Sequence, residues 1–84
     1  MDEIMNVQCD LNKLFSKGET NVTIIYKGAT DYEKIKRVVQ KVCNNMQKEV
    51  DDISIKPNIE SIQIRKIVDS ETEIRFVCEL YHRY

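Results

Sequence analysis

The side chains best suited to chemistry in this chain of 84 residues are three cysteines and a single histidine. Cys9, Cys43 and Cys78 are odd in number and widely separated in the sequence. This spacing fits neither a disulfide framework nor a C-x-x-C metal knuckle, so we expect free thiols. His82 lies next to the end of the sequence, where chain ends are rarely held as firmly as a general base requires.

A cysteine becomes a nucleophile only where a neighbouring base or cation favours the thiolate. Cys43 borders an apolar helix stripe and Cys78 lies on the inward face of the last predicted strand, so we expect both to be buried and inert. Cys9 lies in a segment with two interpretations. An enzyme centred on Cys9 is therefore the least favoured of three functional hypotheses.

Two acidic clusters, in residues 51–52 and 69–73, could be taken for metal ligands. Neither has the alternating oxygen ligands and glycine turn of a calcium loop. The sequence also lacks the glycine-rich patterns G-x-G-x-x-G and G-x-x-x-x-G-K, which bind phosphate through backbone amides. We therefore expect no enzymatic activity, no cofactor and no metal.

Basic side chains gather in residues 30–48, although the formal charge of the whole chain is only -1. At 100° per residue, four of them share one side of a predicted helix, away from its apolar stripe. Such a basic ridge usually faces solvent, but it could also bind nucleic-acid phosphates in a salt-dependent way. The residues of this ridge are Lys34, Arg37, Lys41 and Lys48.

The element that must position these residues is an amphipathic helix predicted over residues 30–50. Its apolar residues recur at spacings of three and four and form one stripe. Thr30 and Glu33 match a capping box, which predicts that the helix begins at Thr30. The stripe consists of Ile35, Val38, Val39, Val42, Met46 and Val50.

Residues 3–17 fit two patterns. A helix would place Ile4, Val7 and Leu11 on one face, whereas a strand would alternate Val7 and Cys9 with polar neighbours. Leu14 and Phe15 extend the helical pattern, and asparagine and aspartate disfavour strands. The sequence therefore favours the helix without excluding the strand.

The remaining segments predict strands. Residues 21–27 are rich in β-branched side chains, and residues 61–68 and 74–81 form the two alternating arms of a hairpin, joined by a turn at residues 69–72. A bulge is expected at residues 66–68, where the alternation breaks. Pairing in residues 53–57 should be marginal, because Pro57 cannot donate to a ladder.

Together these elements predict an α+β two-layer sandwich formed by one domain, residues 1–84. One central helix would pack on a mostly antiparallel sheet of three to four strands, in the order (α or β)-β-α-β-β. The other face of the hairpin would carry a mixture of arginine, tyrosine and valine, which is typical of protein contact surfaces. These candidate partner-binding residues are Arg65, Arg75, Val77, Tyr81 and Tyr84.

The order of strand, Gly28, helix and long hairpin over residues 20–82 is similar to the C-terminal two thirds of Alba-type nucleic-acid-binding domains. The likeness lies in NVTIIYKG, which leads into the helix, and in ESIQIRKIVDSETEIRFVCEL, which forms the hairpin. It is a likeness of topology. It implies a nucleic-acid-binding module that uses the basic ridge, which we keep as the alternative hypothesis.

The favoured hypothesis is a small non-enzymatic module that binds another protein through a sheet face or edge, with a homodimer expected. A compact chain of this kind also suits a phage or mobile-element regulator or inhibitor. No apolar run approaches the length of a membrane span, and the start Met1-Asp2-Glu3 is acidic where a secretory signal is basic. We therefore expect a cytoplasmic protein that does not bind membranes.

Overall fold

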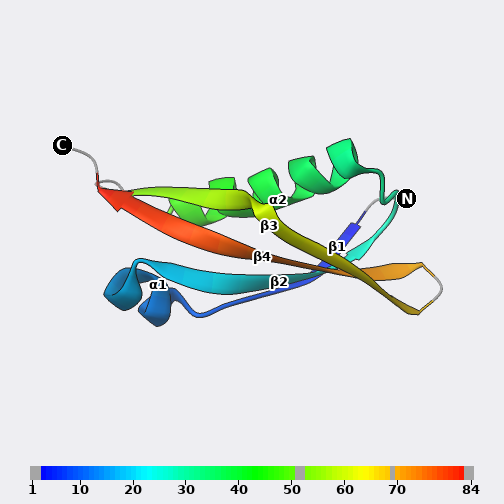
Figure 1. Ribbon diagram of the computed structural model, residues 1–84, viewed down its shortest axis with the longest axis horizontal. Helices are drawn as coiled ribbons and strands as arrows, with labels where there is room; N and C mark the ends of the chain where they lie inside the picture. Colours follow the sequence, from blue (N-terminus) through cyan, green and yellow to red (C-terminus); the bar gives the residue numbers. More distant parts are fainter. Residues whose placement is uncertain (1–2, 51–52, 69, 83–84) are drawn as a thin grey trace.

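The computed structural model shows an α+β two-layer sandwich in which helices pack on a four-stranded antiparallel sheet (Figure 1). It describes residues 3–50, 53–68 and 70–82. The predicted class is therefore confirmed, although the order of elements is β-α-β-α-β-β. The elements are β1 (Glu3–Cys9), α1 (Leu11–Lys17), β2 (Glu19–Lys27), α2 (Tyr32–Gln47), β3 (Ile53–Val68) and β4 (Glu71–His82).

The segment 3–17 is neither all helix nor all strand. It forms β1 and then α1, so each of the two patterns describes one half. Asp10 separates them, because its carboxylate accepts a hydrogen bond from the backbone N–H of Lys13 at 3.0 Å and caps α1. Gly18 ends α1 in the left-handed conformation, with φ of 84°, which glycine adopts without strain.

The central helix was predicted over residues 30–50 and is shorter at both ends. Its N-cap is Asp31, whose carboxylate accepts a hydrogen bond from the Lys34 N–H at 3.2 Å. The predicted capping box at Thr30 is therefore wrong by one residue, because aspartate is as good a cap as threonine and lies nearer the first turn. At the other end, Lys48 is the C-cap.

The strands lie in the order β1-β2-β4-β3, so β1 and β3 form the two edges of the sheet. Residues 53–57, where little pairing was expected, belong to the first half of β3, and Pro57 pairs with Cys78. Proline is tolerated there because β3 is an edge strand. The register shifts between Lys66 and Val68, as predicted, and also between Asn58 and Gln63.

The hydrophobic core lies between the sheet and α2. Alternate residues of β2 and β4 point inward and are met by the apolar stripe of α2. The stripe is buried from Ile35 to Val42, as predicted, whereas Met46 and Val50 are only partly buried. Leu14 joins the same core from α1 and is fully buried. The fully buried strand residues are Val22, Ile24, Tyr26, Ile74, Phe76 and Cys78.

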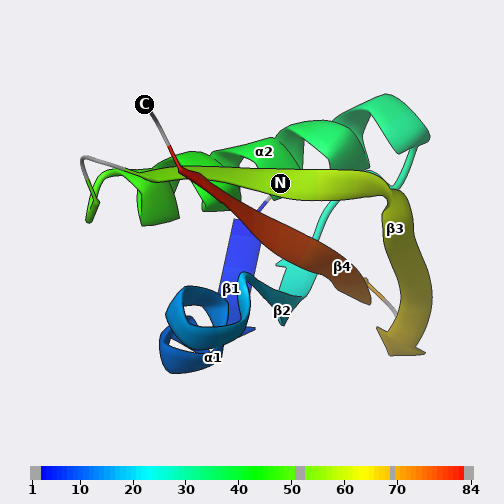
Figure 2. The ribbon, with the colours of Figure 1, turned by 60° about the vertical axis from the view of Figure 1, so that its left-hand side comes forward.

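The helix α2 does not lie over the middle of the sheet. Figure 2 shows it running alongside the first half of β3, which then bends away from it. The molecule is elongated, 43 × 21 × 18 Å, with α1 at one end and the hairpin tip between β3 and β4 at the other (Figure 1). Because α2 lies beside β3, a groove remains between α2 and β1.

Candidate functional site

The edge of β1 is open. Within the described ranges, the hydrogen-bonded neighbour of β1 is β2 alone. Its sequence EIMNVQC holds neither a proline nor a lysine, two residues that commonly protect strand edges. Its register shifts once, between Ile4 and Asn6, and is regular from Asn6 to Cys9. Backbone N–H and C=O groups on this side of β1 can therefore accept another strand.

The opposite edge, β3, is covered by the side chain of Gln47. Its amide nitrogen donates to the Ile53 carbonyl at 2.6 Å, and its amide oxygen accepts from the Ile55 N–H at 2.7 Å. The side chain thus bonds to the strand much as a neighbouring strand would. Pro57 and the irregularity that follows Asn58 interrupt the same edge further along.

An apolar groove separates β1 from α2 and has a volume of about 640 Å³. Its floor and walls are mainly aliphatic, and Val7 and Leu11 remain 40% and 43% exposed. Met5 and Phe15 are also exposed nearby in the sequence. The lining residues are Glu3, Ile4, Val7, Leu11, Lys41, Val42, Asn45, Met46 and Glu49.

The groove continues into a basic hollow near the start of β1. Lys34, Arg37 and Lys41 line this hollow together with Glu3 and Ile4. The two hollows share Glu3, Ile4 and Lys41, so they form one trough along the seam between β1 and α2. Because β1 begins beside the first turns of α2 and ends beside its last turns, the two elements run in the same direction.

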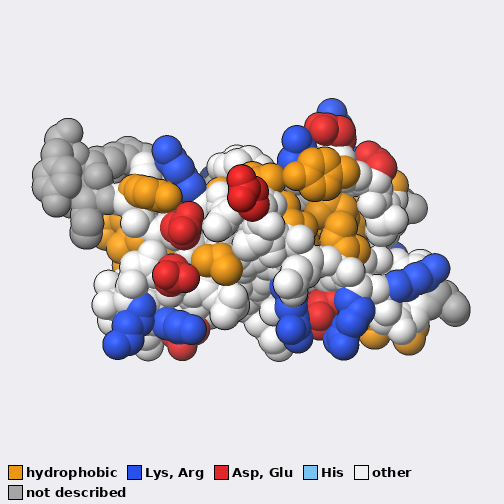
Figure 3. Space-filling model, viewed as in Figure 1, with side chains coloured by type: hydrophobic (Ala, Val, Ile, Leu, Met, Phe, Trp, Pro, Cys, Tyr) orange, Lys and Arg blue, Asp and Glu red, His pale blue; other side chains and the backbone are white. Residues whose placement is uncertain are grey.

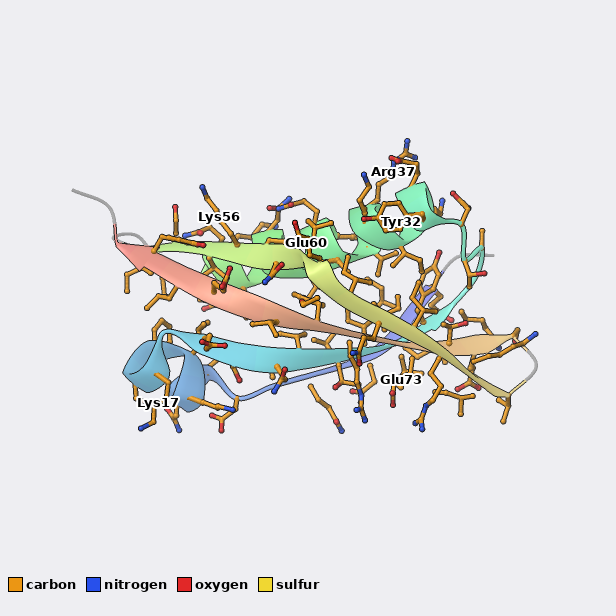
Figure 4. All side chains as sticks on the ribbon, viewed as in Figure 1. Lys17, Tyr32, Arg37, Lys56, Glu60 and Glu73 are labelled. Atoms are coloured by element: carbon orange, nitrogen blue, oxygen red, sulfur yellow. The ribbon has the colours of Figure 1, made fainter. Side chains whose placement is uncertain are left out.

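The predicted basic ridge is therefore brought together only in part. Lys34 and Lys41 border the apolar stripe on the β1 side instead of lying away from it, and Lys34 is half-buried. Arg37 projects from the N-terminal half of α2 (Figure 4). Lys48 is exposed at the C-terminal end of the helix, more than one turn beyond Lys41.

The described members of the predicted partner-binding set lie on the sheet face away from α2, but both of its arginines are ion-paired with Glu73. The Glu73 carboxylate, which points away from α2 (Figure 4), binds Arg75 at 2.9 Å and Arg65 at 3.2 Å. Basic and acidic side chains accordingly alternate along this part of the surface (Figure 3). The face presents no field of one sign to a partner.

Tyr81 and Val77, which were also predicted to bind a partner, make contacts within the chain. The Tyr81 hydroxyl donates to Glu79 at 3.2 Å, and the Lys56 ammonium lies 5.6 Å from the Tyr81 ring. The Glu79 charge raises the pKa of Tyr81. Val77 is half-buried, and its N–H donates to the Ser61 hydroxyl at 2.7 Å. Tyr84 lies outside the described residues.

The three cysteines meet near the core although the sequence keeps them apart. Cys43 and Cys78 are fully buried, as predicted, and Cys9 is half-buried on β1. The hydrogen bond with Cys78, and then burial, raises the pKa of Cys43. Burial, followed by the proximity of Cys78, raises the pKa of Cys9. The hydrogen bond with Cys43 lowers the pKa of Cys78, whereas burial opposes that change. For Cys43 and Cys9 the surroundings favour the unreactive thiol form.

Among the described residues, no cluster of histidine, cysteine or carboxylate side chains has the geometry to hold a metal ion. The acidic positions 51, 52 and 69 and the side chain of His82 lie outside that description. In the same part of the chain, neither helix has both the length and the apolar character needed to cross a bilayer.

The fold therefore defines an α+β sandwich with one open strand edge beside a trough. Searches of protein-family models, of curated proteins and of solved structures returned no match to this chain. The Alba-type likeness thus remains a likeness of element order, to which β1 now adds a strand before residue 20.

Several residues of the trough were not singled out from the sequence. Val7 and Leu11 were assigned to a helix face or a strand face without a partner surface. Glu49 was not assigned any role. The spacing of Lys41, Asn45 and Glu49 at four residues is the one signal in the sequence that places a polar row beside the apolar stripe.

Proposed function

We propose that the chain is a small, non-enzymatic protein-binding module that takes up an extended segment of another protein at the edge of β1. The observation that carries this proposal is an open strand edge next to an apolar groove. An added strand would bond to the free backbone groups of β1. Every second side chain of that strand would then point into the groove.

The chemistry of the trough defines the segment that fits it. The aliphatic lining around Val7, Val42 and Met46 favours apolar side chains at alternate positions. Three cations line the hollow near the start of β1, against the single carboxylate of Glu3. The bound segment should therefore carry an acidic residue at the end that lies beside Lys41 and Arg37.

A peptide-display selection on the wild-type protein tests this proposal. We expect selected peptides to alternate apolar residues and to carry an acidic residue at one end. Their binding should weaken about tenfold or more in Val7→Lys, since a lysine would place a charge in the groove and on the strand edge. Val68→Lys is the matched control, because Val68 is exposed on the other edge strand.

Nuclear magnetic resonance locates the bound peptide. Peptide-induced shifts should concentrate in β1 and in the facing side of α2. Peptides that bind Val7→Lys as well as the wild type, or that shift residues of the outer sheet face instead, would contradict the proposal. A selection that enriches no peptide above background would contradict it too.

A second candidate is a nucleic-acid-binding module, favoured by the three cations that line one hollow. Phosphate contacts of this kind hold the backbone without reading the sequence. Binding of single- or double-stranded oligonucleotides should then fall steeply with added salt and weaken in both Lys41→Glu and Lys48→Glu. Peptide binding at β1 should weaken in Lys41→Glu and stay unchanged in Lys48→Glu. This difference separates the two candidate functions.

A further inference from the structure

The chain contains a segment with the properties that the trough requires. Residues 3–9 are already extended as β1. Ile4 and Val7 point toward α2, because they pair with Tyr26 and Ile24, which are buried in the core. The strand is followed directly by Asp10, an exposed acidic residue. An extended strand that turns apolar side chains toward α2 and has an acidic end is thus present in every copy, with a register shift between Ile4 and Asn6.

We infer that the segment bound at the edge of β1 is the β1 strand of a second copy of the chain. This inference identifies the partner and rests on the proposed function. The two strands would run antiparallel about a two-fold axis perpendicular to the sheet. Each copy has four strands, and pairing at β1 would join them into one continuous sheet. Both helices α2 would then lie on the same side of it.

Charge complementarity selects this antiparallel arrangement. Pairing of the full strand from Glu3 to Cys9 sets Asn6, its middle residue, against Asn6 of the other copy. Cys9 of one copy then faces Glu3 of the other, and Asp10 follows it at the basic hollow, where three cations outnumber the single Glu3 carboxylate. Long lysine and arginine side chains can reach an acidic group there, and the contact occurs twice by symmetry.

The exposed apolar residues support the same surface. Met5, Val7, Leu11 and Phe15 are all between 40% and 48% exposed and fall within one short stretch of the chain. Self-pairing would bring Met5 of one copy opposite Val7 of the other. The outer sheet face is a weaker interface, since Arg65 and Arg75 are already ion-paired with Glu73 of the same copy.

Light scattering after size-exclusion chromatography tests the interface with matched variants. The wild type should be a dimer, and Val7→Lys should be a monomer of unchanged circular dichroism. Val68→Lys introduces the same change on the other edge strand and should remain a dimer. The double variant Val77→Glu/Tyr81→Glu changes the outer face and should also remain a dimer.

A charge cycle tests the arrangement of the two copies. Lys41→Glu should raise the dimer dissociation constant about tenfold or more, whereas Lys48→Glu on the same helix should leave it unchanged. Asp10→Asn should weaken the wild-type dimer, since asparagine keeps the helix cap and removes the charge. In the Lys41→Glu background, Asp10→Asn should instead strengthen the dimer, because it removes a repulsion.

The outcomes separate this inference from the proposed function. A wild-type monomer that still binds the selected peptides at β1 overturns the second copy as the partner and leaves the proposed function standing. A dimer that survives Val7→Lys and dissociates in Val77→Glu/Tyr81→Glu overturns the inference by placing the interface on the outer face. Additive effects in the Lys41 and Asp10 cycle overturn the antiparallel arrangement.

Discussion

At the scale of single residues, the cysteine thiols serve mainly as buried, close-packed side chains. Cys43 and Cys78 lie in the core, and the burial of Cys9 is incomplete only because β1 is an edge strand. An ionised thiol in such surroundings would lose its hydration, so the neutral form is favoured. The same burial makes each thiol a reporter of unfolding.

We predict that Cys43 and Cys78 react with a chromogenic disulfide reagent only when the protein unfolds, and that Cys9 reacts slowly in the native state. The thiol pKa of Cys43 is raised in the native state, chiefly by the hydrogen bond with Cys78, so its contribution to stability is complete below pH 9.0 and is lost progressively as the pH rises above that value. In Cys43→Ala/Cys78→Val, the free energy of unfolding should fall less steeply above pH 9.0. Equal slopes in the two proteins would contradict the assignment.

A second prediction concerns the residue that begins α2. Asp31→Ala should lower the free energy of unfolding by about 1 kcal/mol, because it removes the hydrogen bond to the Lys34 N–H. Thr30→Ala, one residue away, should change it by less than about 0.5 kcal/mol. Urea denaturation measures both. A larger loss in Thr30→Ala would restore the capping box that the sequence suggested.

At the scale of elements, periodicity predicts the interior better than it predicts boundaries. The stripe of α2 and the alternation of β4 each repeat many times, so both could be assigned from the sequence. Residues 3–17 change period at Asp10, and a single pattern fitted across that change fails. The cap at Asp31 was missed because Thr30 and Asp31 are both good caps.

The trough could not be predicted for a different reason. Its walls come from β1 and α2, which are distant in the sequence, and their distance apart depends on α2 lying beside β3. That position is fixed partly by Gln47, whose amide bonds to Ile53 and Ile55. No local pattern marks a glutamine that covers a strand edge, whereas the outward residues of the hairpin are visible in the alternation.

Gln47 therefore gives a prediction at this scale. Gln47→Ala should lower the free energy of unfolding by about 1–3 kcal/mol, since it leaves the Ile55 N–H and the Ile53 carbonyl without that partner. Gln40→Ala is the control, because the Gln40 amide bonds only to Asn44 on the exposed side of the helix. It should change stability by less than about 0.5 kcal/mol. Equal effects in urea denaturation would show that Gln47 does not hold α2 against β3.

At the scale of the whole molecule, the two edge strands of the sheet, β1 and β3, differ in how well their backbone groups are covered. β3 is covered by a side chain, interrupted by proline and shifted in register at two places. In the described part of the chain β1 has no proline and no such side chain over its edge, and its register shifts once, between Ile4 and Asn6. Unprotected edges lead to association with other strands. A small domain also hides a modest share of its surface, so burying the trough against a second copy would add stability.

This association makes thermal stability depend on protein concentration. If folding is coupled to pairing at β1, the Tm of the wild type should rise by about 4 °C for each tenfold increase in concentration above the dissociation constant. Val7→Lys should have a Tm that does not change with concentration, and Val68→Lys should behave like the wild type. Differential scanning calorimetry over two decades of concentration measures this. A constant Tm in the wild type would mean that the chain folds alone and that its open edge is reserved for a different protein.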